Sequence, residues 1–566
     1  MAKTYTQLRP DASIIILESA DSVGGVWSST RLYPGLKTNN LLGSYENPDF
    51  PMTPETFGVE SAHHIPGPVV HSYLDQFARH YNLLSKVRYR HKVDKVEEQD
   101  HVSSGDWKLT VKRPASGDGS AETVQFTADK LVIATGVTNH PNLPRILGDE
   151  QFNSPIYHAR DFYQHQGLLH NARRVVVYGG AKSAWDGVYA YATAGVEVDW
   201  VMRESGRGPC WMAPPFMADG SWLENVAVTR LFAIFGPCWW TQGDGFDWLR
   251  WLLHSTIIGN FFVNIFWSSF EKTLVKLNGY DTHPEIEKLK PWSGVWWAGT
   301  SLSILNYPTG FFDLLRSGKV RVHHGDIVSL SQRKVHLSNG RYISDIDALH
   351  CSTGWKHEPP IQFSPLSLAI KLGLPVNGQN TLPHTNAARK EVISRFAMLR
   401  QQPNVNPRRK RTSETKASSA ELSPYRLYRH TVPPSFWEKR NICFLGTFLS
   451  LGQPVSAQCQ SLWAAAYLDG ALPSQSRVGR PLAIKEIEWE TELQTSYHSL
   501  RSPASCGSKH GEFTFETVPF YDLLLRDLGL KTKRKPTWWK EMTEPYGPGD
   551  YKGLVDEWSE LLKKRE

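Results

Sequence analysis

The residues best suited to cofactor chemistry lie in a glycine turn between residues 173 and 203. Gly179 and Gly180 follow an apolar β-branched run, and a helix-compatible segment then leads to a second apolar run that ends at Arg203. Glycines let a backbone turn sharply and approach a pyrophosphate, whose charge lies at the free N–H groups of a helix N-terminus. The order of strand, glycine turn, helix and strand predicts a dinucleotide-binding unit, with an ordinary strand–helix loop as the alternative.

Arg203 indicates which nicotinamide cofactor this unit takes. It stands where a carboxylate commonly binds a ribose 2′-OH, and a cation there favours a 2′-phosphate. We therefore expect NADPH rather than NADH. The expected cofactor-binding residues of this unit are Gly179, Ser183, Ala184, Asp186 and Arg203.

The N-terminal segment has the pattern of a second nucleotide unit. It begins as the latter part of a helix, turns at Pro10 and continues as an apolar strand over residues 14–17 that ends in Glu18. An acidic residue at this place suits a ribose hydroxyl. The glycine turn that should precede the helix does not occur, so we expect the strand at 14–17 to lack its central parallel neighbour.

Several ordered motifs together resemble the flavin-containing monooxygenases. They are Glu18, Gly24-Gly25-Val26-Trp27, Thr38-Asn39-Asn40, the Val-Ile-Ala-Thr-Gly run ending at Gly136, the spacing Phe152, His158 and Phe162, the turn Gly179 to Asp186, residues 351–355, and the closing segment around Gly446. Two positions depart from the family pattern, Ser154 and Ala181, where glycine is usual. The resemblance also implies a strand and a glycine turn before the matched residues, so we expect about 20 residues of the FAD-binding unit to be lacking.

The resemblance implies two cofactors, FAD and NADPH, and a role for each matched residue. FAD is expected to contact Glu18, Gly24, Gly25, Val26, Trp27, Thr38, Asn39, Asn40, Gly136 and Gly446. Asn39 would lie beside the reactive edge of the flavin. His158 would either act in the hydride or oxygen step or anchor the interdomain linker, and Asn39 and His158 are the two catalytic candidates.

The expected fold is α/β, with two dinucleotide-binding, Rossmann-like domains, a mostly helical insertion and a helical C-terminal tail. Residues 1–168 would form the first part of the FAD-binding domain, and residues 169–354 the NADPH-binding domain with a tryptophan-rich insertion at about 206–309. Residues 355–490 would complete the FAD-binding domain, with a polar loop at about 401–424, and residues 491–566 would form the tail. Short alternating runs within 86–128 predict an antiparallel meander.

The composition of the chain bears on which kinds of partner it binds. Charged residues make up 21% of the chain and hydrophobic residues 40%, which is typical of a globular protein, and the net charge of +7 is spread along the chain. No nucleic-acid partner is therefore indicated. The six cysteines show no ligand spacing, so we expect reduced thiols, no metal site and a cytoplasmic location. The sequence does not define the oligomeric state.

Residues 248–270 form a long and mostly apolar stretch, interrupted by Arg250, His254, Asn260 and Asn264 and flanked by tryptophans. It only marginally reaches the roughly 20 apolar residues that a spanning helix needs. The favoured interpretation is a helix over the mouth of the active site, with an interfacial membrane contact as the alternative and a true span less favoured than either.

These features predict a monooxygenase that uses NADPH, FAD and O₂ to insert one oxygen atom into a lipophilic small molecule. The long insertion resembles fungal enzymes that tailor polyketides and other secondary metabolites. Epoxidation or hydroxylation is favoured over Baeyer–Villiger insertion, because neither Trp-Pro nor Trp-Asp follows Phe162. The alternatives are a flavin reductase or dehydrogenase that transfers no oxygen, and a degenerate binding protein without cofactor.

Overall fold

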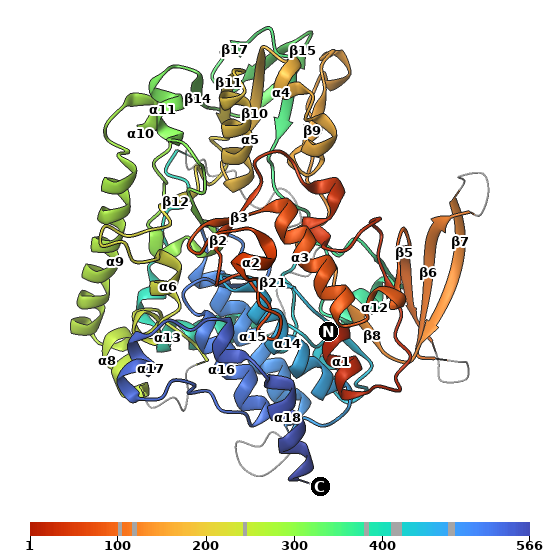
Figure 1. Cartoon of the computed structure of the whole chain (residues 1–566). Coiled ribbons are helices and arrows are strands. Elements are labelled where there is room, and N and C mark those ends of the chain that lie inside the picture. Colours follow the sequence, from red (N-terminus) through yellow and green to blue (C-terminus); the bar gives the residue numbers. More distant parts are fainter. Residues whose placement is uncertain are drawn as a thin grey trace.

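The computed structural model describes residues 1–99, 105–115, 121–240, 246–377, 384–408, 422–473 and 482–565. It shows the mixed α/β architecture that the sequence predicts (Figure 1). Of the expected polar loop at 401–424, residues 409–421 lie outside this description.

The second nucleotide unit contains a five-stranded parallel sheet at the top of Figure 1. Its strand order is β14-β11-β10-β18-β9. The strands are β14 (Val320–His324), β11 (Glu197–Met202), β10 (Arg174–Tyr178), β18 (Ala348–Cys351) and β9 (Ile156–His158). Helix α5 (Lys182–Thr193) crosses from β10 to β11, which form adjacent parallel strands, so the predicted strand–turn–helix–strand unit is confirmed.

Around this sheet lie short elements that close the unit. They are α4 (Leu168–Asn171), α11 (Phe311–Arg316) and a small antiparallel sheet of β15 (Ile327–Ser331), β16 (Lys334–Leu337) and β17 (Tyr342–Ile343). The β-branched run Val175, Val176 and Val177 is fully buried, which explains why β10 occupies the middle of the sheet.

The first nucleotide unit is built on two separate parallel pairs. Strand β1 (Ile16–Leu17) pairs with β4 (Val87–Arg88), and β8 (Leu131–Ile133) pairs with β20 (Ile442–Phe444). Helix α1 (Ala2–Leu8) packs on α14 (Gln453–Leu468), as the N-terminal helical pattern predicts. Each pair lies in its own two-stranded sheet in the described chain, so no continuous sheet joins β1 to β20.

Several further elements complete this unit. Strand β2 (Lys37–Leu41) pairs with β3 (His64–Pro66), and α2 (Pro54–Phe57) and α3 (Gly67–His80) lie beside them in Figure 1. The predicted meander is confirmed as β5 (Lys92–Glu98), β6 (Trp107–Pro114) and β7 (Ala121–Ala128), and it projects at the right of Figure 1. Strand β19 (Gln362–Ser364) extends this sheet, and α12 (Leu366–Lys371) follows it.

The insertion is mostly helical, as expected. It holds α6 (Leu223–Ala227), α7 (Arg230–Ile234), α8 (Asp247–Ser255), α9 (Ile257–Asn278) and α10 (Pro284–Glu287), and β12 (Trp211–Ala213) pairs in it with β13 (Leu302–Ile304). The apolar stretch at 248–270 is divided between α8 and α9, because the Thr256 side chain accepts a hydrogen bond from Gly259 N and caps a new helix. No helix in the described part of the chain has the length and apolarity needed to cross a membrane.

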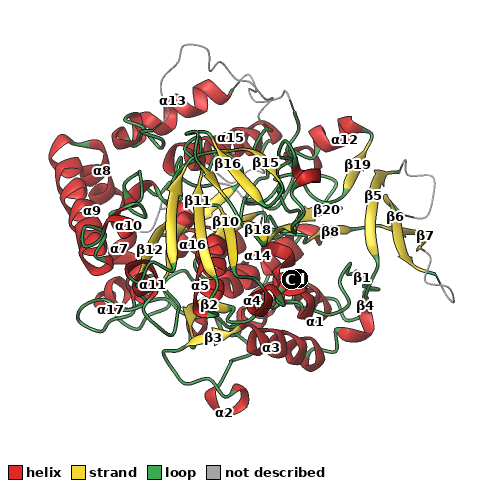
Figure 2. Ribbon diagram, turned by 90° about the horizontal axis from the view of Figure 1, so that it is seen from above, coloured by secondary structure: helices red, strands yellow, loops and turns green. Residues whose placement is uncertain are grey.

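Helices of the C-terminal region pack against α7 of the insertion, and Figure 2 shows α17 (Trp538–Thr543) at the left of the view from above, on the same side as α7. The elements of this region are α15 (Ile484–Arg501), β22 (Gly511–Phe513), α16 (Thr517–Leu528), α17 (Trp538–Thr543) and α18 (Leu554–Lys563). Strand β22 pairs with β21 (Phe448–Ser450), and α15 packs on α13 (Thr385–Arg395). Helix α15 crosses the boundary expected at residue 490. Buried Arg230 on α7 forms ion pairs with Asp522 and Glu541, so the insertion and the tail are linked by charge as well as by packing.

Candidate active site

The glycine turn after β10 is held in a space that admits no side chain. Gly179 has φ +144°, and a Cβ built on it would lie 2.2 Å from Ser352 O. A Cβ on Gly180 would lie 2.6 Å from Gly208 O. Both positions therefore require glycine because other parts of the chain pack closely against this turn.

The other expected residues of this unit lie around the same turn. Ala184 is fully buried in α5, whereas Ser183 is exposed in the first turn of that helix. Arg203 directly follows β11 and is exposed. Gly179 N donates to Val201 O at 3.0 Å, which ties the turn to the strand that ends beside Arg203. Because β10 and β11 are parallel neighbours, the N-terminus of α5 and Arg203 follow them at the same edge of the sheet.

On the other unit, Glu18 and two glycines shape the expected FAD site. The Glu18 carboxylate follows β1 and accepts a hydrogen bond from Ala20 N at 2.8 Å. Gly24 and Gly25 both have positive φ, +109° and +58°, so the backbone turns sharply there. Beyond the turn, Trp27 Nε1 donates to Tyr45 OH at 3.0 Å, while Val26 is exposed.

Gly136 and Gly446 meet where strands β8 and β20 end. A Cβ built on Gly446 would lie 3.9 Å from Gly136 Cα, and Gly446 N donates to Gln460 Oε1 at 3.2 Å. Two motifs that are 310 residues apart in the chain therefore form one surface of small residues. That surface leaves room for a flat cofactor next to backbone.

Strand β2 carries Thr38, Asn39 and Asn40. Asn39 is exposed, and its Nδ2 donates to Ser303 Oγ at 3.1 Å. Asn40 points the other way, as alternate residues of a strand do, and its Nδ2 donates to Glu224 Oε2 at 2.8 Å. Thr38 Oγ1 accepts from Ile65 N at 3.0 Å, which joins β2 to β3.

Glu224 is a buried carboxylate behind this strand. Besides Asn40, it accepts hydrogen bonds from Leu41 N at 2.9 Å and Ser44 Oγ at 2.8 Å. Burial raises the pKa of Glu224, and these three hydrogen bonds act in the opposite direction. Glu224 therefore fixes the path of β2 and the orientation of the Asn39 side chain that alternates with Asn40.

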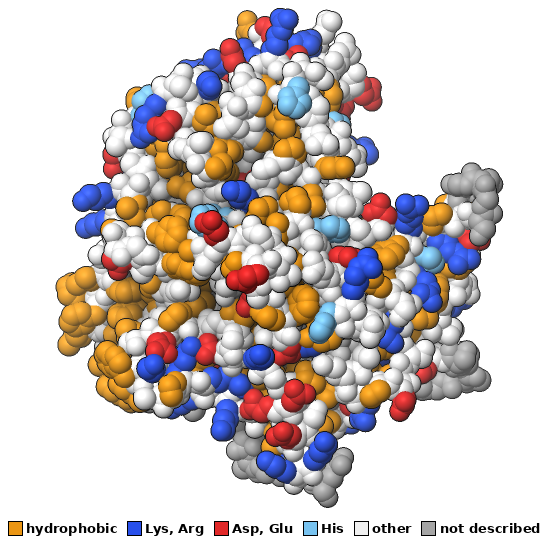
Figure 3. Space-filling model, in the orientation of Figure 1, with side chains coloured by type: hydrophobic (Ala, Val, Ile, Leu, Met, Phe, Trp, Pro, Cys, Tyr) orange, Lys and Arg blue, Asp and Glu red, His pale blue; other side chains and the backbone are white. Residues whose placement is uncertain are grey.

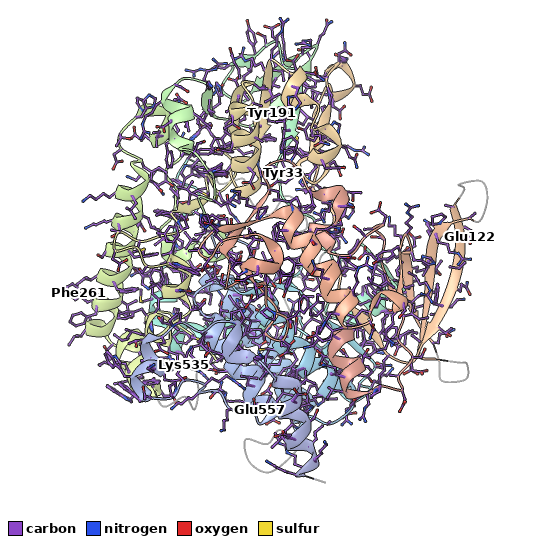
Figure 4. The ribbon with its side chains drawn as sticks, in the orientation of Figure 1. Tyr33, Glu122, Tyr191, Phe261, Lys535 and Glu557 are labelled. Atoms are coloured by element: carbon purple, nitrogen blue, oxygen red, sulfur yellow. The ribbon has the colours of Figure 1, made fainter. Side chains whose placement is uncertain are left out.

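The Asp186 carboxylate connects the two units. It accepts hydrogen bonds from Tyr33 OH at 3.0 Å and Tyr307 OH at 2.9 Å, and it pairs with Lys182. Lys182 Nζ also donates to Asn306 Oδ1 at 2.9 Å. Figure 4 shows Tyr33 at the junction between the N-terminal unit and the sheet unit above it.

Asn306 extends this network to the strand that carries Asn39. Its Nδ2 donates to Lys37 O at 3.2 Å and to Thr38 O at 3.1 Å. The glycine-turn helix α5 is therefore connected to β2 through side chains of the insertion. These hydrogen bonds therefore link the elements that carry the two expected cofactor sites.

A cavity of about 290 Å³ lies between the two units. Val26, Trp27 and Ser183 are the sequence-predicted site residues that line it, and Tyr33, Phe162 and His350 line it as well. Glu18, Arg203 and Gly446 are not among its lining residues. Neither catalytic candidate, Asn39 or His158, is among them, so the structure brings only three of the expected site residues together at this cavity.

His158 has both ring nitrogens engaged by backbone. Nδ1 accepts from Arg160 N at 3.1 Å, and Nε2 therefore carries the proton and donates to Gly354 O at 2.9 Å. Burial lowers the pKa of His158, which keeps the ring neutral near pH 7. The ring bridges β9 and the turn after β18, the geometry expected of a linker anchor.

Two residues that line the cavity, Tyr33 and His350, were not predicted from the sequence. Four further site residues were also missed: Glu224, Ser303, Asn306 and Tyr307. All four come from the insertion or its end, where no motif marks them. Among the described residues, no group of three or more His, Cys, Asp or Glu side chains could hold a metal ion. All six cysteines are free thiols.

Comparison with known proteins identifies the class. A family model described as L-lysine 6-monooxygenase/L-ornithine 5-monooxygenase matches residues 56–213. The chain is 31% identical to the FAD-dependent monooxygenase resA of Aspergillus sclerotiorum, over 98% of this chain and 95% of that protein. It is 32% identical to an FAD-dependent monooxygenase of Pyrenophora dematioidea, over 94% and 96%.

A solved structure shares the fold. The polycyclic ketone monooxygenase of Thermothelomyces thermophila aligns with a TM-score of 0.57 at 14% identity, over 93% of this chain and 85% of that one. The two relatives above 30% identity, aligned over almost the whole chain, define the class as flavoprotein oxygenases. The chain belongs to the family of FAD-dependent monooxygenases, as the sequence motifs predict, and NADPH is the electron donor typical of that family.

Substitution of Gly179 by alanine tests the glycine turn. We expect Gly179→Ala to lower the free energy of unfolding by at least about 2 kcal/mol and to abolish NADPH binding, because its Cβ would overlap Ser352 O. Gly195→Ala is the matched control, since Gly195 also has positive φ but a Cβ there meets no atom within 4 Å. Denaturant unfolding and titration with NADPH would check both. Equal losses of stability and of NADPH binding in the two variants would show that the positive φ, and not the close approach to Ser352 O, determines the effect.

Proposed function

We propose that the protein uses NADPH and O₂ to insert one oxygen atom into a lipophilic small molecule, a secondary metabolite such as a polyketide. The cavity between the two nucleotide units carries this proposal, because its lining combines the expected FAD residues Val26 and Trp27 with Ser183 of the NADPH helix. Bound FAD supplies the redox chemistry, accepting a hydride and activating O₂.

The chain's own groups would bind the cofactors and position them. FAD would be held by Glu18, the turn at Gly24 and Gly25, strand β2 and the small surface of Gly136 and Gly446. NADPH would be held by the Gly179 turn, α5 and Arg203. Asn39 would donate a hydrogen bond at the reacting centre, with Ser303 fixing its amide. His158 would keep the linker in place rather than exchange a proton.

The apolar character of the site favours a lipophilic substrate. Phe162 and Trp355 line the cavity, and Phe162 itself is almost fully buried. Arg31 and Arg160 line it too, so its apolar walls include a cationic part, where the phosphates of a cofactor could bind. We favour epoxidation or hydroxylation over Baeyer–Villiger insertion, on the sequence that follows Phe162.

Labelled oxygen tests the proposed reaction. With purified protein loaded with FAD, we expect NADPH oxidation under ¹⁸O₂ to place one ¹⁸O atom in a lipophilic olefin, measured by mass spectrometry. NADPH oxidation that forms only hydrogen peroxide with every such substrate would favour a flavin reductase. A chain that takes up no FAD would favour a degenerate binding protein.

Arg203 tests the choice of nicotinamide. We expect Arg203→Ala to raise the KM for NADPH at least about tenfold and to leave the KM for NADH within about twofold, because only NADPH carries the 2′-phosphate. Steady-state oxidation of both nucleotides checks this. The control is Arg316→Ala, an exposed arginine on α11 that pairs with Asp313. A parallel rise for both nucleotides would contradict the assignment of Arg203.

A further inference from the structure

The outer face of the α8–α9 hairpin is apolar and open to solvent. On α9, Ile257 is 90% exposed and Phe261 61% exposed, and Ile258, Phe262 and Ile265 are also exposed. On α8, Trp248 is 67% exposed, and Trp251 and Leu252 are exposed beside it. These side chains form one patch at the left edge of the molecule, orange in Figure 3, and Figure 4 labels Phe261 there. Contiguous exposed apolar surface of this kind marks an interaction site.

The hairpin is held firmly from its inner side. Val263, Trp267 and Leu274 are buried, and Trp267 Nε1 donates to Phe235 O at 2.9 Å. His254 Nε2 donates to Ile234 O at 2.9 Å, and Ser255 Oγ donates to Arg395 O at 3.0 Å. The exposed side chains therefore belong to a rigid element whose inner face already has its partners.

The exposed face of α9 changes in polarity along its length. Its N-terminal half presents mainly isoleucine and phenylalanine, with Asn264 among them. The exposed residues of its C-terminal half are Ser268, Ser269, Lys272, Lys276 and Leu277, of which only the last is apolar. The apolar side chains therefore cluster near the turn that joins α8 to α9. This distribution of apolar side chains is expected of a helical hairpin that inserts only its turn into an apolar layer.

A second segment extends the patch. Trp538 and Trp539 on α17 are exposed, and the Trp538 ring lies 6.5 Å from that of Phe246, the residue just before α8. Figure 1 shows α17 next to α8 at the lower left. We call the exposed side chains of α8, α9 and α17 together the apolar rim.

Lysines border the rim at α17. Lys531 and Lys533 are exposed in the segment that leads to the two tryptophans, and exposed Lys540 follows them and pairs with Glu544. Asp247 is the exposed acidic residue at the start of α8. Tryptophan and lysine side chains are commonly found together at the headgroup level of a bilayer. The indole rings lie at the interface, and the ammonium groups lie near the lipid phosphates.

A shallow groove of about 520 Å³ runs along α9 within the rim. It is lined by Phe235, Phe262, Ile265, Phe266, Phe270 and two hydroxyl side chains. Its lining is mostly aromatic and aliphatic, and its long axis follows the helix. Such a groove can take an acyl chain alongside α9.

We propose that the apolar rim docks the protein on the surface of an anionic lipid bilayer. The hairpin tip would enter the acyl boundary while Lys531 and Lys533 face lipid phosphates, and no described helix needs to span. A second copy of the chain is the less favoured occupant, because a symmetric contact through the rim would gather the same lysines around it. This surface lies outside the cavity and does not depend on the proposed oxygenation.

Vesicle flotation with the full-length protein tests the proposal. We expect the protein to float with vesicles of phosphatidylcholine and phosphatidylserine at low salt, and less with phosphatidylcholine alone. Trp251→Ser with Phe261→Ser should weaken binding at least about tenfold, because two large side chains no longer leave water. Trp538→Ser with Trp539→Ser should do the same from the other segment, and Lys531→Glu with Lys533→Glu should weaken binding and remove its salt dependence.

Leu366→Ser is the matched control, since Leu366 on α12 is 69% exposed and lies outside the rim. It should leave flotation unchanged. Each variant's thermal midpoint, compared with the parent protein, shows that it is folded. Absence of flotation with anionic vesicles, an equal loss in Leu366→Ser, or a rim-dependent dimer in sedimentation without lipid binding would each overturn the proposal.

Discussion

The Asp186 carboxylate carries the interaction on which the arrangement of the two nucleotide units depends. Tyr33 comes from the N-terminal unit, Tyr307 from the end of the insertion and Lys182 from the glycine-turn helix, and all three converge on this side chain. Burial and the nearby Asp186 charge raise the pKa of Tyr33 well above its usual value, so Tyr33 stays a hydrogen-bond donor at all physiological pH. Since Asn306 continues the network to Thr38, moving α5 would also move the strand that carries Asn39.

Local patterns in the sequence predicted the parts whose structure depends on close neighbours in the chain. The glycine turn at Gly179 was predictable because β10 and α5 flank it directly and only glycine fits its approach to Ser352. The meander from β5 to β7 follows from alternating burial, with Trp107 and Val111 inward. The motifs also located Val26, Trp27 and Ser183, which the structure brings to one cavity.

Contacts between distant segments could not be predicted in this way. Glu224 meets Asn40 across 184 residues, and Ser303 meets Asn39 across 264, so only the folded insertion brings them together. For residues 248–270 the sequence favours one helix over the mouth of the active site. In the structure, the helix cap at Thr256 divides this stretch into two helices, and its residues do not line the cavity. Hydrophobicity alone does not tell which apolar residues remain exposed, and here the outward face of α8 and α9 stays apolar.

The rate of flavin reduction by NADPH under anaerobic conditions tests most directly whether the Asp186 network sets the geometry between the two units. Stopped-flow absorbance of Tyr33→Phe should show a reduction at least about tenfold slower than in the parent protein, with unchanged FAD content, because the ring remains and only its hydrogen bond to Asp186 is lost. Tyr189→Phe on α5, the helix that carries Asp186, is the control: it removes a hydroxyl that is hydrogen-bonded to the Thr309 side chain, and its flavin should be reduced at the parent rate. Equal rates in Tyr33→Phe and the parent protein would contradict the account.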